Sequence, residues 1–361
     1  MDLTLHLTHR CNLACSYCYA APERGGRDMG EEVLDAALAL AVSEARPRGY
    51  FTVTYFGGEP LLRLDLIRRG VSGSEALAAG AGVEVSHRVC TNGLLLDDAA
   101  LDYCEDHGVG LSLSFDGVRE AHDAHRRFAD GRGSFEATLS RLEAALARLP
   151  YTTVQLVVTP ETAALLPASV ELLLDRGVRY LLTTLDYTAA WDEESVGALA
   201  TAYDAVATLY EQRTLAEQKF YLSCLDGKIS SWTKGPVKRH ERCSAGVGQV
   251  SVAASGRIYP CVQFVGDDSD HRHAIGHVLE GGFDGARRAS VAVEGEREKV
   301  SCAGCAVADR CNNWCACLNW YTTRRLDPVG PLQCPHERLL LGAADRAAEE
   351  AGALAIVTGE C

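Results

Sequence analysis

The stretch Arg10–Ala20 reads RCNLACSYCYA and follows a segment in which Leu3, Leu5 and Leu7 alternate with polar residues. The alternation predicts a β-strand, so the three cysteines lie on the loop that ends the first strand. Three thiolates on one short loop can bind three corners of an iron–sulfur cube. The loop has no fourth local ligand, which leaves one iron able to bind another molecule. A zinc knuckle completed by a distant ligand is the alternative, and this spacing suits zinc less well.

Alternating strand and helix patterns surround this loop. Five further β-branched or alternating segments predict strands, at 51–56, 83–89, 109–115, 153–159 and 178–184. Helical patterns lie between them, at 36–45, from 63 past 70, and at 97–107, 135–149 and 162–176. Six βα units in series predict an α/β fold with a parallel sheet, either doubly wound or a curved, partial (β/α)6 barrel. In both, chemistry gathers at the carboxyl ends of the strands.

Composition limits the possible partners. The chain has 361 residues with 35 Lys plus Arg against 49 Asp plus Glu, a net charge of −14. This acidity argues against general binding to nucleic acid or an anionic membrane. The sequence shows no apolar run of the ~18 residues that a membrane span needs, and no signal-peptide pattern at its start. We therefore expect a cytoplasmic protein.

Cysteine is abundant, with 15 residues against 2 Met. In a reducing compartment these cysteines are rarely disulfides, so metal binding or redox chemistry is expected. The later cysteines have their own spacing: Cys243-x12-Gly256-x4-Cys261, then Cys302-x2-Cys305-x5-Cys311-x3-Cys315, and finally Cys334. Read alone, this segment could form one or two zinc ribbons.

The first cysteine motif, with Tyr17 in its aromatic position, resembles the signature of radical S-adenosylmethionine (radical SAM) enzymes. Four more motifs resemble that family in the same order, each after a predicted strand. They are Gly57–Pro60 (GGEP), Thr91–Gly93 (TNG), Ser112–Gly117 (SLSFDG) and His122–Arg126 (HDAHR). Any one of them could be an ordinary turn or a surface charge, whereas five in order are specific. The resemblance covers about residues 1–225.

The resemblance implies a [4Fe–4S] cluster on Cys11, Cys15 and Cys18 whose free iron binds S-adenosylmethionine. Reduction of that complex yields a 5′-deoxyadenosyl radical that abstracts hydrogen. It also implies that Glu59 holds the methionyl ammonium and Arg126 the carboxylate, with Ser114 at the ribose and Val158 near adenine. The full set of implied contacts is Tyr17, Gly57, Gly58, Glu59, Pro60, Asn92, Ser114, Arg126 and Val158.

The order of the later cysteines resembles the SPASM domain, a C-terminal extension that binds two auxiliary [4Fe–4S] clusters. That resemblance implies three clusters in all. Auxiliary cluster I takes Cys243, Cys261 and Cys315, and auxiliary cluster II takes Cys302, Cys305, Cys311 and Cys334. Cluster I is then one ligand short, and Cys317, Cys224 or an open iron could complete it. We expect a radical SAM core over 1–225, a bridging and SPASM region over 226–340, and a C-terminal helix and tail over 341–361.

Enzymes of this layout mostly modify peptides or proteins. The resemblance is to maturases of ribosomally made peptides and, less closely, to anaerobic sulfatase maturases. The latter place a basic Asp just after the second SPASM cysteine, where this chain has Val262. Because valine cannot accept a proton, an intrapeptide crosslink, thioether or carbon–carbon, is favoured over formylglycine formation. Peptide epimerisation is a further alternative, and a non-catalytic iron–sulfur or zinc scaffold is the alternative outside enzymes.

The resemblance also implies partners: a precursor peptide as substrate and an electron donor such as flavodoxin or ferredoxin. No winged-helix-like segment precedes Met1. We therefore expect leader recognition to use the core, the region between the domains, or a separate leader-binding protein.

Overall fold

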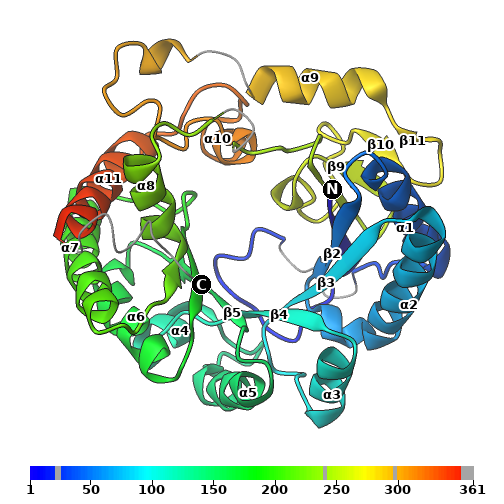
Figure 1. The fold of residues 1–361 in the computed structure, drawn as a ribbon, viewed down its shortest axis with the longest axis horizontal. Helices are drawn as coiled ribbons and strands as arrows, with labels where there is room; N and C mark the ends of the chain where they lie inside the picture. Colours follow the sequence, from blue (N-terminus) through cyan, green and yellow to red (C-terminus); the bar gives the residue numbers. More distant parts are fainter. Residues whose placement is uncertain (21–25, 239–241, 296–298, 351–361) are drawn as a thin grey trace. The chain divides into compact units, whose positions relative to one another are not determined.

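A computed structural model describes residues 1–20, 26–238, 242–295 and 299–350 (Figure 1). The chain forms two compact units, each built from separate stretches of sequence. Unit 1 consists of 1–114, 126–149 and 244–296, and unit 2 of 115–125, 150–243 and 297–361. The functional boundaries expected at 225 and 340 stay predictions.

The sheet of unit 1 has a parallel centre that matches the first four predicted strands. Its strands are β1 (Asp2–Thr8), β2 (Tyr50–Gly57), β3 (Glu84–Thr91) and β4 (Val109–Ser114). They pair in this order, each parallel to the next. The parallel α/β fold expected from the sequence is thereby confirmed. All four carboxyl ends lie at one edge, which brings the predicted motif loops together.

Helices cover one face of these strands. The helical elements of unit 1 are α1 (Glu31–Ala45), η1 (Pro60–Arg63), α2 (Leu64–Ala81), α3 (Asp98–Asp106), α5 (Phe135–Arg148) and α9 (Gly285–Gly295). The neighbouring α1 and α2 pack on β2 and β3 (Figure 1). Leu5, Val53 and Val89 are fully buried. Alternate positions such as Thr54 and Arg88 are more exposed, so the sheet has one apolar face and one polar face.

A hairpin that turns at Ser255–Gly256 extends the sheet of unit 1. Its strands β8 (Gln249–Val252) and β9 (Arg257–Tyr259) are antiparallel, and β8 pairs in parallel with β1. Two short strands and a 3-10 turn follow: β10 (Gly276–His277), β11 (Gly282–Phe283) and η4 (Val262–Phe264). Without this hairpin β1 would present an unpaired edge. This pairing could not be predicted, because the two partner strands are far apart in the chain.

Unit 2 contains the remaining strands and most of the later cysteines. Its strands are β5 (Thr153–Val158), β6 (Tyr180–Leu185) and β7 (Tyr221–Leu222), parallel in that order. Its helical elements are α4 (Arg119–His125), η2 (Ala163–Leu165), α6 (Leu166–Asp175), α7 (Glu193–Leu215), α8 (Ser223–Thr233), η5 (Val300–Cys302), α10 (Ala316–Thr323) and α11 (Gln333–Glu350). No helix among the described residues has the length and apolarity to cross a membrane.

Polar side chains tie α11 to the rest of unit 2. Lys228 Nζ lies 2.6 Å from Glu337 Oε2, and the Glu337 side chain is only 3% exposed. Arg310 donates two hydrogen bonds to Asp345, of 2.9 and 2.5 Å. Removing one partner of the buried Lys228–Glu337 pair costs about 3–5 kcal/mol, because the other charge stays buried. Helix α11 begins at Gln333, before the C-terminal helix and tail expected over 341–361, and residues 351–361 lie outside the described residues.

Candidate functional site

The loop carrying the first three cysteines is held by backbone bonds from neighbouring strand ends. Gly58 N–H donates to Thr8 C=O at 2.7 Å, and Glu59 N–H donates to Arg10 C=O at 2.9 Å. A Cβ on Gly57 would overlap the carbonyl oxygen of Thr8, and a Cβ on Gly58 would overlap that of Arg10. Gly57 also has φ +134°, a conformation that L side chains rarely adopt. The two glycines are therefore required for the cysteine loop to lie against the end of β2.

A second anchor of this loop was not foreseen from the sequence. Asp28 accepts hydrogen bonds from Thr8 Oγ1 at 2.6 Å and from Arg10 at 2.9 and 2.5 Å. Arg63 lies 3.3 Å from the same carboxylate. Burial alone would raise the pKa of Asp28. The hydrogen bonds from Arg10 and Thr8, together with the charges of Arg10 and Arg63, outweigh burial and lower this pKa. No local motif marks Asp28, because its partners come from β1 and η1.

The three thiols of the loop differ in their surroundings. Cys11 Sγ accepts N–H contacts from Leu13 at 3.4 Å and from Asn92 Nδ2 at 3.7 Å. Burial raises the pKa of Cys11 to about 11. Cys18 N–H donates to Cys15 C=O at 3.2 Å, which curls the loop between them. All three cysteines are half-buried and free of disulfides.

The donor set fits an iron–sulfur cluster better than zinc or a hard cation. Within the described parts of the chain, no three His, Cys, Asp or Glu side chains are already gathered at metal-binding distance. The loop nevertheless offers three thiols, and Cys11 already accepts the N–H contacts that tune clusters in proteins. Thiolate is the usual iron ligand in such clusters.

Glu59 is the centre of a hydrogen-bond network that joins two of the predicted motifs. Its Oε1 accepts from Leu61 N–H at 3.0 Å and from Thr91 Oγ1 at 2.8 Å, and its Oε2 accepts from Asn92 N–H at 2.8 Å. The residue is fully buried, and burial raises the pKa of Glu59 to about 7 in spite of these bonds. The GGEP and TNG segments are thus held together by one carboxylate.

Asn92 extends this network to the cysteine loop. Its Nδ2 donates to Asn12 Oδ1 at 2.7 Å as well as contacting Cys11 Sγ, and its Oδ1 accepts from Leu94 N–H at 3.1 Å. The side chain of Asn92 therefore has a fixed orientation beside the first thiol. The sequence pointed to Asn92 through the TNG motif, but not to its contact with Cys11.

Arg126 and Tyr17, both expected at the site, are brought together in unit 1. The guanidinium carbon of Arg126 lies 5.4 Å from the centre of the Tyr17 ring. Arg126 is only 7% exposed, and its carbonyl accepts hydrogen bonds from Ser134 N–H and Oγ. Ser114 is half-buried at the end of β4 in the same unit. Val158 is buried at the end of β5 and belongs to unit 2.

Most of the later cysteines lie in unit 2, where Cys315 has two other thiols close by. Cys315 Sγ lies 3.3 Å from Cys317 Sγ at the start of α10, and hydrogen bonds from Cys243 and Cys317 lower the pKa of Cys315 well below its ordinary value. Cys224 lies in the first turn of α8. Cys261 belongs to unit 1, where it is buried directly before η4.

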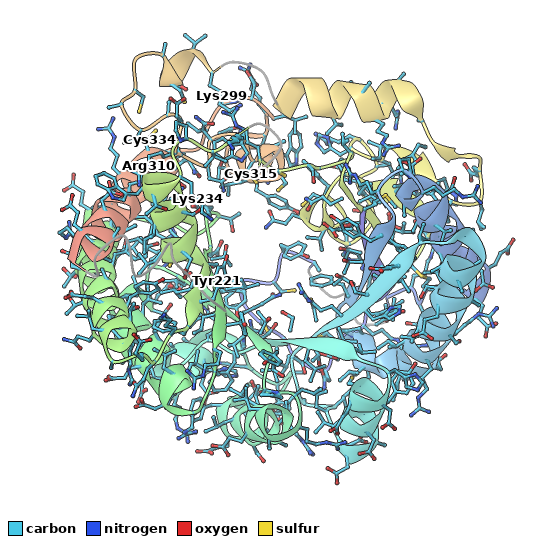
Figure 2. All side chains as sticks on the ribbon, viewed as in Figure 1. Tyr221, Lys234, Lys299, Arg310, Cys315 and Cys334 are labelled. Atoms are coloured by element: carbon cyan, nitrogen blue, oxygen red, sulfur yellow. The ribbon has the colours of Figure 1, made fainter. Side chains whose placement is uncertain are left out.

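The other four cysteines of unit 2 that the spacing assigns to a cluster, all free of disulfides, are Cys302, Cys305, Cys311 and Cys334. Cys305 N–H donates to Cys302 C=O at 3.1 Å, and Asn313 Nδ2 contacts Cys302 Sγ at 3.6 Å. Burial, followed by the charge of Glu337, raises the pKa of Cys311 to about 12. Cys334 and Cys315 come from separate segments of unit 2 (Figure 2).

Comparison with known proteins gives concordant matches. Residues 5–173 match the model of the radical SAM superfamily. The chain is 30% identical over 268 residues to the PqqA peptide cyclase of Gluconobacter oxydans, an alignment that covers 72% of this chain and 70% of the relative. It is 26% identical over 337 residues to the serine-type anaerobic sulfatase-maturating enzyme of Klebsiella aerogenes, covering 88% of this chain and 80% of the relative.

The solved structures show the same fold. Native anSMEcpe with bound AdoMet superposes with a TM-score of 0.81 at 16% identity, over 98% of this chain and 99% of that one. Both sequence relatives are enzymes by name, which excludes the alternative of a non-catalytic scaffold. The family implies S-adenosylmethionine and a [4Fe–4S] cluster as cofactors. On the superfamily model and the cyclase relative together, this chain is a member of the radical SAM superfamily.

Proposed function

We propose that this enzyme is a peptide maturase that forms an intrapeptide crosslink, thioether or carbon–carbon, in a ribosomally made precursor peptide. The observation that carries the proposal is the convergence of the cysteine loop, GGEP and TNG at one sheet edge, tied together by Glu59. The similarity to a peptide cyclase supports a peptide as the substrate.

In this proposal Cys11, Cys15 and Cys18 hold the [4Fe–4S] cluster. When bound, the cluster and S-adenosylmethionine supply a 5′-deoxyadenosyl radical that abstracts hydrogen from the peptide. The chain's own residues orient the cofactor and exclude water. The fixed orientation of Asn92 and the close approach of Gly57 and Gly58 support a rigid cradle on this side of the loop.

We assign the charged ends of S-adenosylmethionine to two buried side chains. Arg126 binds the carboxylate, since a guanidinium can donate two parallel hydrogen bonds to it. The Glu59 carboxylate accepts the ammonium with the lone pairs that its three protein donors do not use. The remaining contacts are assigned to Tyr17, the backbone of Gly57, Gly58 and Pro60, Asn92, Ser114 and Val158.

The auxiliary clusters are the next part of the proposal. Auxiliary cluster II takes Cys302, Cys305, Cys311 and Cys334, and auxiliary cluster I takes Cys243, Cys261 and Cys315. Cys317 supplies the fourth thiolate of cluster I. Its 3.3 Å approach to Cys315 supports this choice over Cys224, whose helix begins elsewhere in unit 2.

The choice of crosslinking over formylglycine formation rests on the residue after Cys261. Val262 begins η4 and has no group that can accept a proton. The peptide radical would then form a bond to a second atom of the peptide with loss of one proton and one electron, and auxiliary cluster I would accept that electron. Formylglycine formation is the second candidate, because the relationship to the sulfatase-maturating enzyme covers 88% of this chain. Peptide epimerisation is the third.

A flavodoxin or ferredoxin supplies the electron in this proposal. A separate protein that binds the leader of the precursor is the second partner. Both assignments rest on the family's chemistry.

Mass spectrometry of a precursor peptide separates the candidate reactions. The peptide encoded beside this gene is co-expressed with the enzyme and analysed intact and after proteolysis. A crosslink removes two hydrogen atoms and makes the peptide lighter by their mass. Epimerisation leaves the mass unchanged, and formylglycine gives an aldehyde that hydrazines trap. An aldehyde product would show that the inference from Val262 is wrong.

A further inference from the structure

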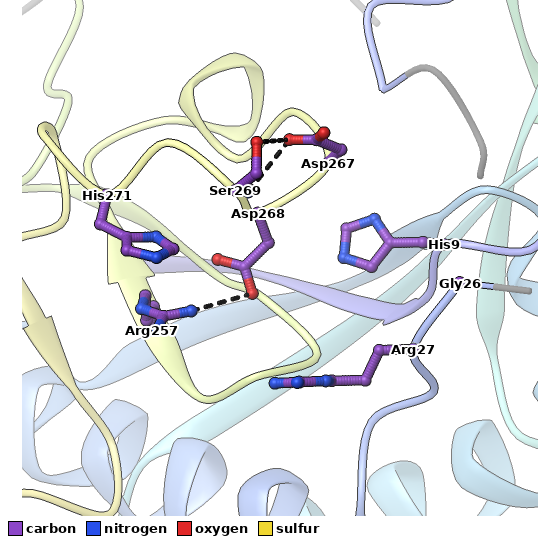
Figure 3. A pocket seen from close by; sticks show the side chains of 8 residues that line it. All are labelled: His9, Gly26, Arg27, Arg257, Asp267, Asp268, Ser269 and His271. Atoms are coloured by element: carbon purple, nitrogen blue, oxygen red, sulfur yellow. Dashed lines mark hydrogen bonds and ion pairs between the residues drawn. The ribbon is translucent and has the colours of Figure 1, made fainter.

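Unit 1 contains a cavity of about 490 Å³ that none of the assigned roles uses (Figure 3). Its volume lies within the range of roughly 300–1,000 Å³ that is usual for ligand pockets. Charged and polar groups dominate its lining. The lining residues are His9, Gly26, Arg27, Arg257, Asp267, Asp268, Ser269 and His271.

The cavity lies beside the segments that carry cluster cysteines. One wall includes His9, two residues before Cys11, and another begins at Asp267, six residues after Cys261. Because β8 runs parallel to β1, their carboxyl ends lie at the same sheet edge, where the cysteine loop begins. A molecule in this cavity is therefore adjacent to the cysteine loop of the proposed active site.

The two carboxylates of the lining are already bonded within the protein. Asp268 accepts a 2.7 Å hydrogen bond from the hydroxyl of Tyr259, and its side chain is only 8% exposed. Asp267 Oδ1 accepts from Ser269 N–H at 3.0 Å and from Ser269 Oγ at 2.6 Å (Figure 3). These bonds fix both acids in the wall of the cavity.

The two guanidinium groups are much less satisfied. Within the described part of the chain the Arg257 side chain has one ion pair, to Asp268, and its 3.6 Å separation is longer than a hydrogen bond. The side chain of Arg27 is exposed and makes no ion pair or hydrogen bond with any residue that the structure describes. Both side chains line the same cavity (Figure 3). Each guanidinium carries five N–H donors, so donors greatly exceed acceptors there.

We propose that this cavity binds a carboxylate of the substrate peptide between Arg27 and Arg257. The proposal rests on the proposed function, which makes the substrate a peptide. A carboxylate is the peptide group that best matches two guanidinium groups, because each guanidinium can donate two parallel, charge-assisted hydrogen bonds to it. The carboxylate belongs either to an Asp or Glu side chain or to the C-terminus. In a chain with a net charge of −14, such a pair of arginines is also a local attraction for an anion.

Three short Gly/Ser-based peptides with a neutral dye test the proposal by fluorescence anisotropy at low salt. The first is amidated and has a central Gln, the second is amidated and has a central Glu, and the third has Gln and a free C-terminal carboxylate. The protein is the full chain reconstituted with iron and sulfide. We expect the wild type to bind at least one carboxylate peptide about tenfold more tightly than the neutral peptide.

The variants locate that preference. Arg27→Gln and Arg257→Gln should each abolish it, and Arg27→Lys should retain part of it, because lysine keeps the charge and loses the fork. Arg272→Gln is the matched control, since Arg272 lies outside the lining and pairs with Asp270. It should bind like the wild type. Circular dichroism and iron content confirm that each variant is folded.

Preference for the Glu peptide identifies a side-chain carboxylate as the ligand, and preference for the free end identifies the C-terminus. No preference in the wild type, or a preference that persists in both Gln variants, would overturn the proposal. Cleavage of S-adenosylmethionine by the reduced wild type without peptide is measured in parallel. Its absence would count against the proposed function, whereas the anisotropy result decides the role of the cavity.

Discussion

The carboxylate of Glu59 accepts a 2.8 Å hydrogen bond from the backbone N–H of Asn92, and so links the loop after β2 to the loop after β3. Two motifs that are each weak in the sequence are therefore one structural element. Asn92 in turn contacts Cys11, which makes this element continuous with the cysteine loop.

Glu59→Ala should destabilise the protein and weaken binding of S-adenosylmethionine. The substitution leaves the donors of Leu61, Thr91 and Asn92 buried without their acceptor, at a cost of about 1–3 kcal/mol each. Denaturant unfolding should show a loss of roughly 3 kcal/mol or more. Glu84→Ala, at an exposed position of β3, is the control and should change stability by less than about 0.5 kcal/mol. Equal stability of the two variants would contradict the network.

Stability should also depend on pH through Glu59. Burial raises the pKa of Glu59 from 4.5 to about 7, so the folded protein holds this proton more tightly than the unfolded chain. Its contribution to stability is full below the unfolded pKa and is lost as the pH rises through about 7. Glu59→Gln cannot ionise, so the stability of the wild type relative to this variant should fall between about pH 5 and pH 8. Denaturant titrations across that range measure it, and parallel curves would show that Glu59 has an ordinary pKa.

Arg126→Ala should weaken binding of S-adenosylmethionine without unfolding the protein. Losing a charge-assisted partner costs about 1.5–3 kcal/mol, or roughly tenfold to a hundredfold in affinity. The spin signal of the reduced protein, titrated with S-adenosylmethionine, reports the affinity. Arg132→Ala is the matched control, because the side chain of Arg132 is 74% exposed and its ion pair is with the exposed Asp130. Unchanged affinity in Arg126→Ala would remove this residue from the site.

Asn92→Asp should make the cluster on the first cysteine loop harder to reduce. The change removes the N–H donor to Cys11 and adds a negative charge nearby, and both effects disfavour the more negative reduced cluster. A redox titration followed by electron paramagnetic resonance measures the signal that responds to S-adenosylmethionine. Asn313→Asp is the matched control, since Asn313 makes the same kind of contact with Cys302. It should leave the responsive signal unchanged, and a shift in the control alone would contradict the assignment.

Reconstitution should load three [4Fe–4S] clusters, or about twelve irons, on the wild type. Cys15→Ala should retain about eight irons and lose all production of 5′-deoxyadenosine, because the affected cluster is the one that binds S-adenosylmethionine. Cys104→Ala, which removes a buried thiol outside the cluster frameworks, should keep the full iron content. Zinc in place of iron, or unchanged 5′-deoxyadenosine from Cys15→Ala, would refute the cluster assignment.

The sequence was most informative where the signal is local. Alternation and β-branching located the six strands of the βα units, as in Val109–Ser114 and Thr153–Val158. Spacing located the cysteine loops, and the GGEP and TNG segments could be identified because their residues are contiguous. Hydrophobic periodicity is a property of neighbouring residues, which is why these elements could be predicted.

The contacts between distant segments could not be predicted in this way. Asp28 anchors Arg10 across a separation of 18 residues, and β1 pairs with β8, which lies in the last third of the chain. The start of α11 was predicted too late. The helix opens with Gln333, Cys334 and Pro335, which lack the apolar periodicity that indicates a helix. The expected ligand roles of the cysteines and of Val158 stay predictions.

Gly57 and Gly58 leave no space for a side chain, because a Cβ on Gly57 would overlap the carbonyl oxygen of Thr8 at the end of β1, and one on Gly58 would overlap that of Arg10 in the cysteine loop. All glycine codons share their first two bases, so every amino-acid change reached by one base substitution at these positions introduces a Cβ. Silent changes of the third base are thus the mutations that these two codons can accept while the loop holding Cys11 stays where it is. Drift at this pair is therefore coupled to the position of the first thiol, and a lineage that lost either glycine would have to rebuild the loop as well.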